Sequence, residues 1–323
     1  MRTNDHDTPV FLAPLAGITD LPFRQLVSRF GASGTVSEMI ASQDVVQARP
    51  SARARAELGL AAAGTAVQIA GRDAHWMAEA ARLLAGQGAE TIDINMGCPA
   101  KKVTNGYSGS ALMRDLDHAL TLIDAVVGAV DVPVTLKTRL GWDDAALNAP
   151  VLARRAWSAG ISRIVVHGRT RCQFYRGHAN WAAIRQVVDA VPIPVIANGD
   201  IASADQARQA LRASGAAGVM VGRGAQGRPW ALAQIRAALR GRPAVPAPEQ
   251  PAFIDMISEH YEAMLTFYGA PLGLKCARKH LSWYMDQLCV PADVRRTILT
   301  APSPKRTLDA IRHLTDAPQP EAA

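Results

Sequence analysis

The chain has 323 residues, of which 49% are hydrophobic and 20% charged, as in a soluble globular protein. The net charge of +7 and the pI of about 9.5 permit a polyanionic partner without proving one. No run reaches the ~20 apolar residues of a membrane span, the N-terminus lacks the apolar core of a signal peptide, and the four cysteines show neither C-x-x-C nor zinc-ligand spacing. We expect a cytoplasmic protein with reduced thiols, no metal and no membrane segment.

Short apolar runs alternate with helical patterns along most of the chain. Eight strands are predicted, over residues 10–12, 35–36, 65–69, 91–94, 132–136, 163–166, 194–197 and 217–221. Two of these strands begin with proline in similar contexts, VPVTLK and IPVIANGD, which indicates a parallel sheet of repeated units. Eight such units with their helices predict an α/β TIM barrel.

Small residues follow the first strand, in the stretch Ala13-Pro14-Leu15-Ala16-Gly17. They leave room for a flat ligand to lie against the backbone. A plain strand-to-helix turn is the simpler explanation from these residues alone. Thr19 or Asp20 can cap the next helix, which has Pro22 near its first turn.

Gln68 lies near the end of the third strand, among valine and isoleucine. An amide in that setting must find hydrogen-bond partners. The edge of a flavin ring, with carbonyl and N–H groups, would provide them. A core amide bonded to other protein groups is the alternative. An amphipathic helix is then predicted over residues 73–86.

The fourth strand opens the stretch IDINMGCPAKKVTNGYSGS, which places Asn95, Gly97 and Cys98 at the strand exit. A polar amide and a thiol there lie where α/β barrels carry out their chemistry. Lys101 and Lys102 add positive charge, which favours a thiolate or attracts an anion. An inert buried thiol is the alternative for any single cysteine, but position, glycine and lysines favour a reactive Cys98.

The fifth strand ends in Lys137, Thr138 and Arg139. A lysine at the end of an apolar strand is costly unless it meets an anion or a polar ring. Its charge would stabilise negative charge at the N1/O2 edge of a reduced flavin. The alternative is a side chain that reaches out of the barrel mouth. Because residues at these strand ends are usually catalytic, we interpret Lys137 as functional.

The last three strands end in His167-Gly168-Arg169-Thr170, Asn198-Gly199-Asp200 and Gly222-Arg223-Gly224. The last run continues into GRGAQG, which satisfies G-x-G-x-x-G, but a helix and a proline-rich linker follow instead of a second strand. A dinucleotide fingerprint is therefore excluded. The same glycines fit the phosphate site that barrels build from their last two strand loops. We assign its halves to Gly199 and Gly222, with Arg223 adding charge.

Residues 241–251 form a proline-rich linker between a barrel over residues 1–240 and a helical domain over residues 252–323. The apolar face of the first helix there consists of Ile254, Ile257, Tyr261, Met264 and Leu265. The next helix carries Lys275, Arg278 and Lys279, followed by His280, Trp283 and Tyr284. This spacing suits phosphate contacts and base stacking. A solvated face over packed aromatic rings is the rival interpretation.

Charge is unequally divided between the two predicted domains. From residue 245 onward there are eight Lys/Arg and nine Asp/Glu, so the positive surplus lies in the barrel part. An RNA partner would therefore have to contact the basic rim of the barrel as well as the helical domain.

The stretch around Cys98 resembles the signature of the tRNA-dihydrouridine synthases at each fixed position: Ile92-Asp93-Ile94-Asn95, Gly97-Cys98-Pro99 and Gly109-Ser110. The resemblance covers nearly the whole chain, and MGCPAKKVTNGYSGSALM, HGRTRCQFYRG and NGDI are similar to the B-type branch. It implies a TIM barrel followed by a helical tRNA-recognition domain, with FMN as cofactor, NADPH as reductant and tRNA as partner. A monomer is expected.

The resemblance also implies roles for single residues. In the family, the loop after the first strand contacts FMN mainly through its backbone, here at Pro14, Leu15 and Ala16, and many relatives have methionine at Leu15. The other expected cofactor contacts are Gln68, Lys137, His167, Asn198, Gly199, Asp200, Gly222 and Arg223. Asn95 and Arg139 match positions that touch the substrate base or a flanking nucleotide. The expected tRNA contacts are Lys101, Lys275, Arg278 and Lys279.

The leading hypothesis is an oxidoreductase that acts on a CH–CH group, namely the C5=C6 bond of a tRNA uridine, with the D-loop as the expected location. NADPH would reduce FMN and leave, and the uridine would leave its stack. Hydride would pass from flavin N5 to C6, while Cys98 would protonate C5 as general acid.

Two alternatives stay open. An FMN barrel that acts on a free pyrimidine, as dihydroorotate dehydrogenases do, would share the barrel, flavin and lysine, but it would not need the region after residue 252. A flavin-loaded RNA-binding or regulatory protein without turnover would have no use for Cys98 or Lys137.

Overall fold

The computed structural model describes residues 8–47, 64–243 and 245–316, which divide into two compact units. The first unit holds the described residues up to Gly224 together with 231–243, and the second holds Ala225–Trp230 with 245–316. The segment Ala225–Trp230 thus belongs with the C-terminal helices, although barrel elements precede and follow it in the sequence. The domain boundaries expected at residues 240 and 252 stay predictions.

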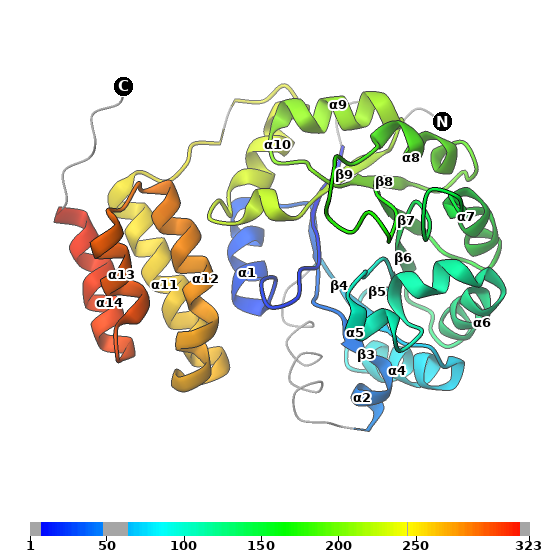
Figure 1. The fold of residues 1–323 in the computed structure, drawn as a ribbon, viewed down its shortest axis with the longest axis horizontal. Helices are drawn as coiled ribbons and strands as arrows, with labels where there is room; N and C mark the ends of the chain where they lie inside the picture. Colours follow the sequence, from blue (N-terminus) through cyan, green and yellow to red (C-terminus); the bar gives the residue numbers. More distant parts are fainter. Residues whose placement is uncertain (1–7, 48–63, 244, 317–323) are drawn as a thin grey trace. The chain divides into compact units, whose positions relative to one another are not determined.

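The first unit is a closed barrel of parallel strands surrounded by helices (Figure 1). Its strands are β1 (Val10–Leu12), β2 (Gly34–Val36), β4 (Thr65–Ala70), β5 (Ile92–Met96), β6 (Val134–Arg139), β7 (Arg163–His167), β8 (Val195–Asn198) and β9 (Gly218–Val221). β1 pairs with both β2 and β9, which closes the ring. The predicted TIM barrel is confirmed, and each predicted strand coincides with an observed one to within three residues at either end.

The second barrel position differs from the expectation because it contains two strand segments. β3 (Ile40–Ala41) follows β2, and both pair with β4, β2 at Thr65 and Ala66 and β3 at Ile69 and Ala70. β3 was not predicted, since a two-residue strand leaves no periodicity to detect.

Helices follow most strands, and several of them begin at a side-chain cap. In the first unit they are α1 (Leu21–Phe30), α2 (Ser42–Val46), α4 (Ala74–Gly86), α5 (Lys101–Thr104), α6 (Leu116–Val127), α7 (Ala149–Ser158), α8 (Trp181–Val188), α9 (Ala204–Ser214) and α10 (Ala231–Leu239), with 3-10 turns η1 (Gly109–Arg114) and η2 (Arg223–Ala225). Asp20 caps α1, because its Oδ1 accepts the Phe23 N–H at 3.0 Å. Asp73 caps the predicted amphipathic helix α4 in the same way.

Alternation along the strands separates an apolar outer layer from a polar interior. On β5, Ile92 and Ile94 pack in the hydrophobic core shared with the surrounding helices, so Asp93 and Asn95 point to the barrel interior. The same argument on the neighbouring strands gives the other polar interior residues, namely Gln68, Thr135, Lys137, Arg139, Arg163, His167 and Asn198. A small interior cluster is apolar: Ala13, Val36, Ala66, Val165, Ile196 and Met220. The barrel therefore brings its polar groups together inside.

The second unit is a bundle of helices that run side by side (Figure 1). They are α11 (Gln250–Tyr268), α12 (Ala270–Gln287), α13 (Ala292–Thr300) and α14 (Pro304–Arg312), followed by the turn η3 (His313–Asp316). The predicted apolar face of α11 is confirmed for Ile254, Ile257, Tyr261 and Met264, which are buried, while Leu265 is half-buried. Trp230 joins this core by packing edge-to-face on Phe253, with ring centroids 5.0 Å apart.

Candidate functional site

A chain of hydrogen bonds links neighbouring strands inside the barrel. Gln68 Nε2 on β4 donates to Asp93 Oδ2 on β5 at 2.7 Å, and Thr135 Oγ1 on β6 donates to Asp93 Oδ1 at 2.5 Å. Asn95 Nδ2 then donates to Gln68 Oε1 at 2.7 Å. Gln68 therefore has protein partners, as the alternative interpretation expected. Each of the two amide nitrogens also carries a second proton beyond these bonds.

Cys98 lies just after the carboxyl end of β5, in a loop that these hydrogen bonds hold in place. Asn95 Oδ1 accepts the N–H groups of Gly97 at 3.2 Å and Cys98 at 3.0 Å. From the other side, Ser110 Oγ donates to the Cys98 carbonyl at 2.8 Å. Gly109 has φ +62°, and a Cβ there would approach the Cys98 carbonyl to 2.8 Å, so this position has no room for a side chain. The loop presents a half-buried thiol in a fixed place.

Lys137 is directly opposite Asn95 in the register between β6 and β5. Its Nζ donates to Asn198 Oδ1 at 3.0 Å. Burial and the nearby charge of Arg139 lower the pKa of Lys137 to about 8, although Asp93 and Cys98 act in the opposite direction. The amine is therefore a cation near neutral pH that can lose its charge under mildly alkaline conditions. The predicted lysine at the strand end is in place among polar groups, inside the barrel.

Arg139, expected to touch the substrate, is almost completely buried and bound to backbone. Its Nε donates to the Gly97 carbonyl at 2.8 Å, and one terminal nitrogen donates to the carbonyls of Thr170 and Phe174, each at 2.9 Å. It also lies over the ring of Tyr175 at 5.7 Å. Arg139 thus ties the Cys98 loop to the loop after β7.

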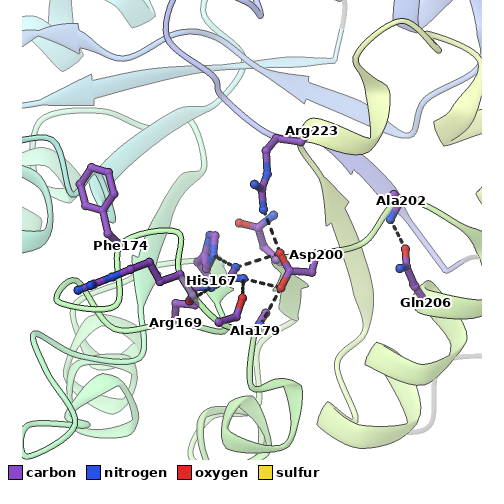
Figure 2. Close-up of polar contacts among 12 residues, drawn as sticks. His167, Arg169, Phe174, Ala179, Asp200, Ala202, Gln206 and Arg223 are labelled. Atoms are coloured by element: carbon purple, nitrogen blue, oxygen red, sulfur yellow. Dashed lines mark hydrogen bonds and ion pairs between the residues drawn. The ribbon is translucent and has the colours of Figure 1, made fainter. Parts of the chain in front are cut away.

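A second polar group gathers at the ends of β7 and β8, where Arg169 and Arg223 converge on Asp200 (Figure 2). Arg169 forms a two-pronged ion pair with Asp200, at 3.0 and 2.6 Å, and Arg223 adds a contact at 3.0 Å. The Ala179 N–H also donates to this carboxylate, at 2.8 Å. Arg169 further donates to the carbonyls of residues 176 and 177, so it fixes the loop after β7.

These arginines set the protonation of their neighbours. Burial alone would raise the pKa of Asp200, but bonds from Arg169 and the Ala179 N–H, with the charges of Arg169 and Arg223, bring it below its usual value. His167 is held neutral, because burial and the charges of Lys137 and three arginines place its pKa well below 6.5. An Arg169 terminal nitrogen, which can only donate, lies 3.3 Å from His167 Nε2, so the imidazole proton belongs on Nδ1. His167 is therefore a poor proton donor at neutral pH.

The ends of β1 and β9 are also neighbours. Gly222 lies against Ala13 and Leu15, since a Cβ on Gly222 would be 3.6 Å from Ala13 and 3.7 Å from Leu15. Gly199, at the end of β8, has φ +115° and no space for a side chain beside Ala179. These bare backbone positions suit close approach of a phosphate, and Lys137 with the spare amide protons suits a ring edge. The residues present thus fit a flavin nucleotide.

Several predicted roles need adjustment. In the phosphate site, Arg223 is already paired with Asp200, although its side chain is 58% exposed. On α12, Lys275, Arg278 and Lys279 are exposed, but His280 and Tyr284 are buried. The prediction of base stacking by these two rings is wrong, because they face the bundle core. For Trp283, which is half-buried, stacking stays a prediction. Lys101 is exposed beside the Cys98 loop, as a contact for an anion requires.

The sequence analysis missed two residues that organise the site, Asp93 and Arg169. Asp93 was treated as part of an apolar run, although strand alternation places it beside Gln68. Arg169 was noted only as part of a strand end. Across residues 8–47, 64–243 and 245–316, no cluster of three or more His, Cys, Asp or Glu could hold a metal ion. Within the same ranges, none of the helices is long and apolar enough to cross a membrane.

Comparison with known proteins adds independent information. The chain matches the family described as "Dihydrouridine synthase (Dus)" over residues 11–319. It is 61% identical to a probable tRNA-dihydrouridine synthase of Rhodobacter capsulatus, over 95% of this chain and 94% of the relative. It is also 47% identical to tRNA-dihydrouridine synthase B of Xanthomonas campestris, over 95% of this chain and 93% of the relative.

Among solved structures, histamine dehydrogenase from Rhizobium sp. 4-9 has a similar fold, with a TM-score of 0.54 at 12% sequence identity. The match covers 79% of this chain but only 49% of that protein, so this chain spans about half its length. At this identity the likeness concerns the fold.

Proposed function

The chain belongs to the dihydrouridine synthase family, a family of oxidoreductases, and from this premise we propose that it is an FMN-dependent enzyme that uses NADPH to reduce a uridine of tRNA to 5,6-dihydrouridine. The D-loop is the proposed location, on the strength of the similarity to a B-type synthase. The proposal includes a monomeric, cytoplasmic protein without a resident metal.

The observation that supports this function most directly is the arrangement of Cys98 and Lys137. A thiol in a fixed loop and a half-buried lysine lie toward the ends of adjacent strands, where barrel enzymes carry out their reactions. A protein that only binds RNA would not need to bury a lysine at this expense, since an exposed cation contacts phosphate equally well.

The proposed cofactor residues divide into two groups. Lys137, Gln68 and His167 would bind the flavin ring, and Asn198 would hold the lysine in place through its 3.0 Å bond. Gly199, Gly222 and the backbone of Pro14, Leu15 and Ala16 would bind the phosphate end, with Arg223 and Asp200 fixing the loops. Reduced FMN, when bound, supplies the hydride for C6 of the uracil.

Proton transfer is the part that this chain's own residues would perform. Cys98 would donate a proton from Sγ to C5 of the uracil, and Asn95, whose second amide proton is available, would orient the base. The thiolate left behind would be stabilised by the charge of Lys137, which interacts with Cys98. His167 is assigned no proton transfer, because its ring is neutral near pH 7.

In the second unit, Lys275, Arg278 and Lys279 would bind tRNA phosphates from the exposed face of α12. Lys101, on the barrel unit, would bind the backbone close to the reacting nucleotide. His280 and Tyr284 have no part in this role, because both are buried.

The test begins with the cofactor released from the purified protein and separated on a reverse-phase column. FMN is expected, and FAD or no flavin would contradict the phosphate site. The flavin is then reduced anaerobically with NADPH and mixed with unmodified tRNA, free uridine or orotate. Reoxidation by tRNA only is expected. Faster reoxidation by a free pyrimidine would replace this function with that of a free-pyrimidine reductase.

A further inference from the structure

The hydrogen bonds between Asp93 and Cys98 have a direction that can be traced from either end. At the Cys98 end, the N–H groups of Gly97 and Cys98 can only donate, so the oxygen of Asn95 must face them. The NH₂ of Asn95 then faces Gln68 and donates to its oxygen. The NH₂ of Gln68 in turn points to Asp93.

At the other end, Asp93 is a carboxylate, which can only accept, whereas the Thr135 hydroxyl could donate or accept. Gln68 donates to one of its oxygens and Thr135 to the other. A carboxylate accepts at both oxygens, whereas an amide of the same shape can offer an NH₂ at one of them. A carboxylate therefore enforces this direction from the Asp93 end. An amide of equal size could turn either its oxygen or its NH₂ to Gln68, because the Thr135 hydroxyl can pair with whichever end remains.

We propose that Asp93 is a positioning residue that, by accepting from Gln68, fixes the amide orientations of Gln68 and Asn95 and so holds the Cys98 loop at the end of β5. If the Asn95 amide rotated, its NH₂ would face two N–H donors, and both bonds to the loop would be lost. Asp93 acts through Gln68 and Asn95 rather than by contact with Cys98.

The surroundings of Asp93 agree with this role. Asp93 is buried, and this burial raises the pKa of its carboxyl, against the bonds from Gln68 and Thr135 and the charges of Arg163 and Lys137. A neutral side chain of the same shape would be easier to bury. The main rival role is that of a counter-charge for Arg163 and Lys137, which would not depend on amide direction.

The first test replaces Asp93 with Asn and measures alkylation of Cys98 by iodoacetamide, followed by peptide mass spectrometry. Loss of both hydrogen bonds from the loop to Asn95 should expose the thiol at least about tenfold more often, and alkylation should accelerate by the same factor. Cys289, which is exposed in the second unit, serves as internal reference and should react at the parent rate. Parent-like alkylation of Cys98 in Asp93→Asn overturns the proposal.

The decisive variant combines Asp93→Asn with Gln68→Glu. The carboxylate introduced at position 68 would accept from the new amide at position 93 and from Asn95, so Asn95 would again present its oxygen to the loop. Alkylation of Cys98 should then return to near the parent rate. A double variant that stays as reactive as Asp93→Asn contradicts fixation by amide direction and favours the counter-charge role.

Two further variants guard against trivial explanations. Thr135→Val removes the other donor to Asp93 but leaves the direction of Gln68 unchanged, so Cys98 should react at the parent rate. If Asp93→Asn does not fold, Gln68→Met provides a second variant. Methionine has a shape similar to glutamine but cannot form the hydrogen bonds to Asp93 and Asn95, so this variant should also accelerate alkylation. Parent-like alkylation in Gln68→Met would overturn the proposal equally.

A last readout rests on the proposed function. A displaced Cys98 should slow flavin reoxidation by tRNA about 100-fold in Asp93→Asn, as small misplacements of reacting groups do, with the KM for tRNA unchanged. The alkylation results decide the role of Asp93 even if the parent protein makes no dihydrouridine. Failure of the proposed function and failure of this inference are therefore distinguishable.

Discussion

The interior of the barrel and the exposed face of α12 both carry polar residues at informative spacing, but they use them differently. In the barrel, Asp93, Gln68 and Asn95 are buried and bonded to one another, so each side chain is fixed by its neighbours. On α12, Lys275, Arg278 and Lys279 point to solvent while His280 and Tyr284 point to the core.

This difference shows what each region can contribute to a reaction. Fixed groups in a protected interior can position atoms for chemistry, because electrostatic interactions are strong there and reorganisation is small. Exposed cations on a helix supply attraction that is screened by salt and tolerates many geometries. Substitutions in the barrel should therefore change reaction rates, and substitutions on α12 should change tRNA affinity and its salt dependence.

The largest effect is expected from Cys98→Ala. Without its thiol, the second half-reaction lacks a proton donor, so flavin reoxidation by tRNA should slow about 100- to 10,000-fold. Reduction of FMN by NADPH needs no proton at the uracil and should change little. Stopped-flow measurement of both half-reactions checks this, with His167→Ala as comparison. If Cys98→Ala reoxidises at the parent rate and His167→Ala does not, His167 is the acid.

The next effect concerns the charge of Lys137. Its pKa of about 8 lies below the ordinary lysine value of 10.5, so the cation is present below pH 8 and is lost as the pH rises through that value. If the neutral amine does not support flavin reduction, the rate with NADPH should fall about tenfold per pH unit above the pKa.

Lys137→Arg provides the matched control for this pH profile. A guanidinium stays charged throughout the accessible range, so the variant should show a flat profile over the same interval, whatever its absolute rate. A parent profile that is equally flat would mean that the charge of Lys137 does not matter for reduction.

A smaller effect is expected from the triple replacement of Lys275, Arg278 and Lys279 by Ala. Each lost phosphate contact reduces the slope of log affinity against log salt by about 0.9, so the slope for tRNA should shrink by up to ~3. Flavin reduction should be unaffected. Replacing the exposed cations Arg296, Lys305 and Arg306 removes the same formal charge from α13 and α14. If both variants reduce the salt dependence of tRNA affinity equally, α12 has no specific role in tRNA binding.

The smallest effect is expected from Tyr284→Phe in the core of the helical unit. The Tyr284 hydroxyl lies 2.8 Å from His260 Nδ1, and losing this buried bond should reduce the free energy of unfolding by ~1–3 kcal/mol. Thermal unfolding measures the change, and flavin reduction at 25 °C reports on the barrel. A variant that unfolds like the parent but reduces its flavin slowly would contradict the separation of roles.

Strand positions could be predicted because short apolar runs with proline and glycine at their ends leave a clear pattern, and because strand ends in a barrel meet at one face. The positions of Cys98 after β5 and of Lys137 on β6 could be predicted in this way, and their functional roles stay predictions. Asp93 was missed although the signal was present. Side-chain alternation places Gln68 on β4 and both Asp93 and Asn95 on β5 inside the barrel, as neighbours on adjacent strands. Arg169 had no such signal, because its partners Asp200, Arg176 and Gly177 become neighbours only after folding.

The aromatic residues of α12 teach a related lesson. Helical spacing places His280 and Tyr284 on the face of Ala277 and Leu281, which are buried. Reading that face as the core would have predicted burial of both rings. The three cations Lys275, Arg278 and Lys279 are exposed, as predicted.

The central claim is that this barrel reduces a uridine within tRNA. The most direct measurement incubates the purified protein with NADPH and unmodified tRNA, followed by nuclease digestion and mass spectrometry. The account predicts a gain of two hydrogens on one uridine of the D-loop and no product with Cys98→Ala in the same period. A tRNA without any reduced uridine, with NADPH oxidised at the expense of a free pyrimidine instead, would contradict it.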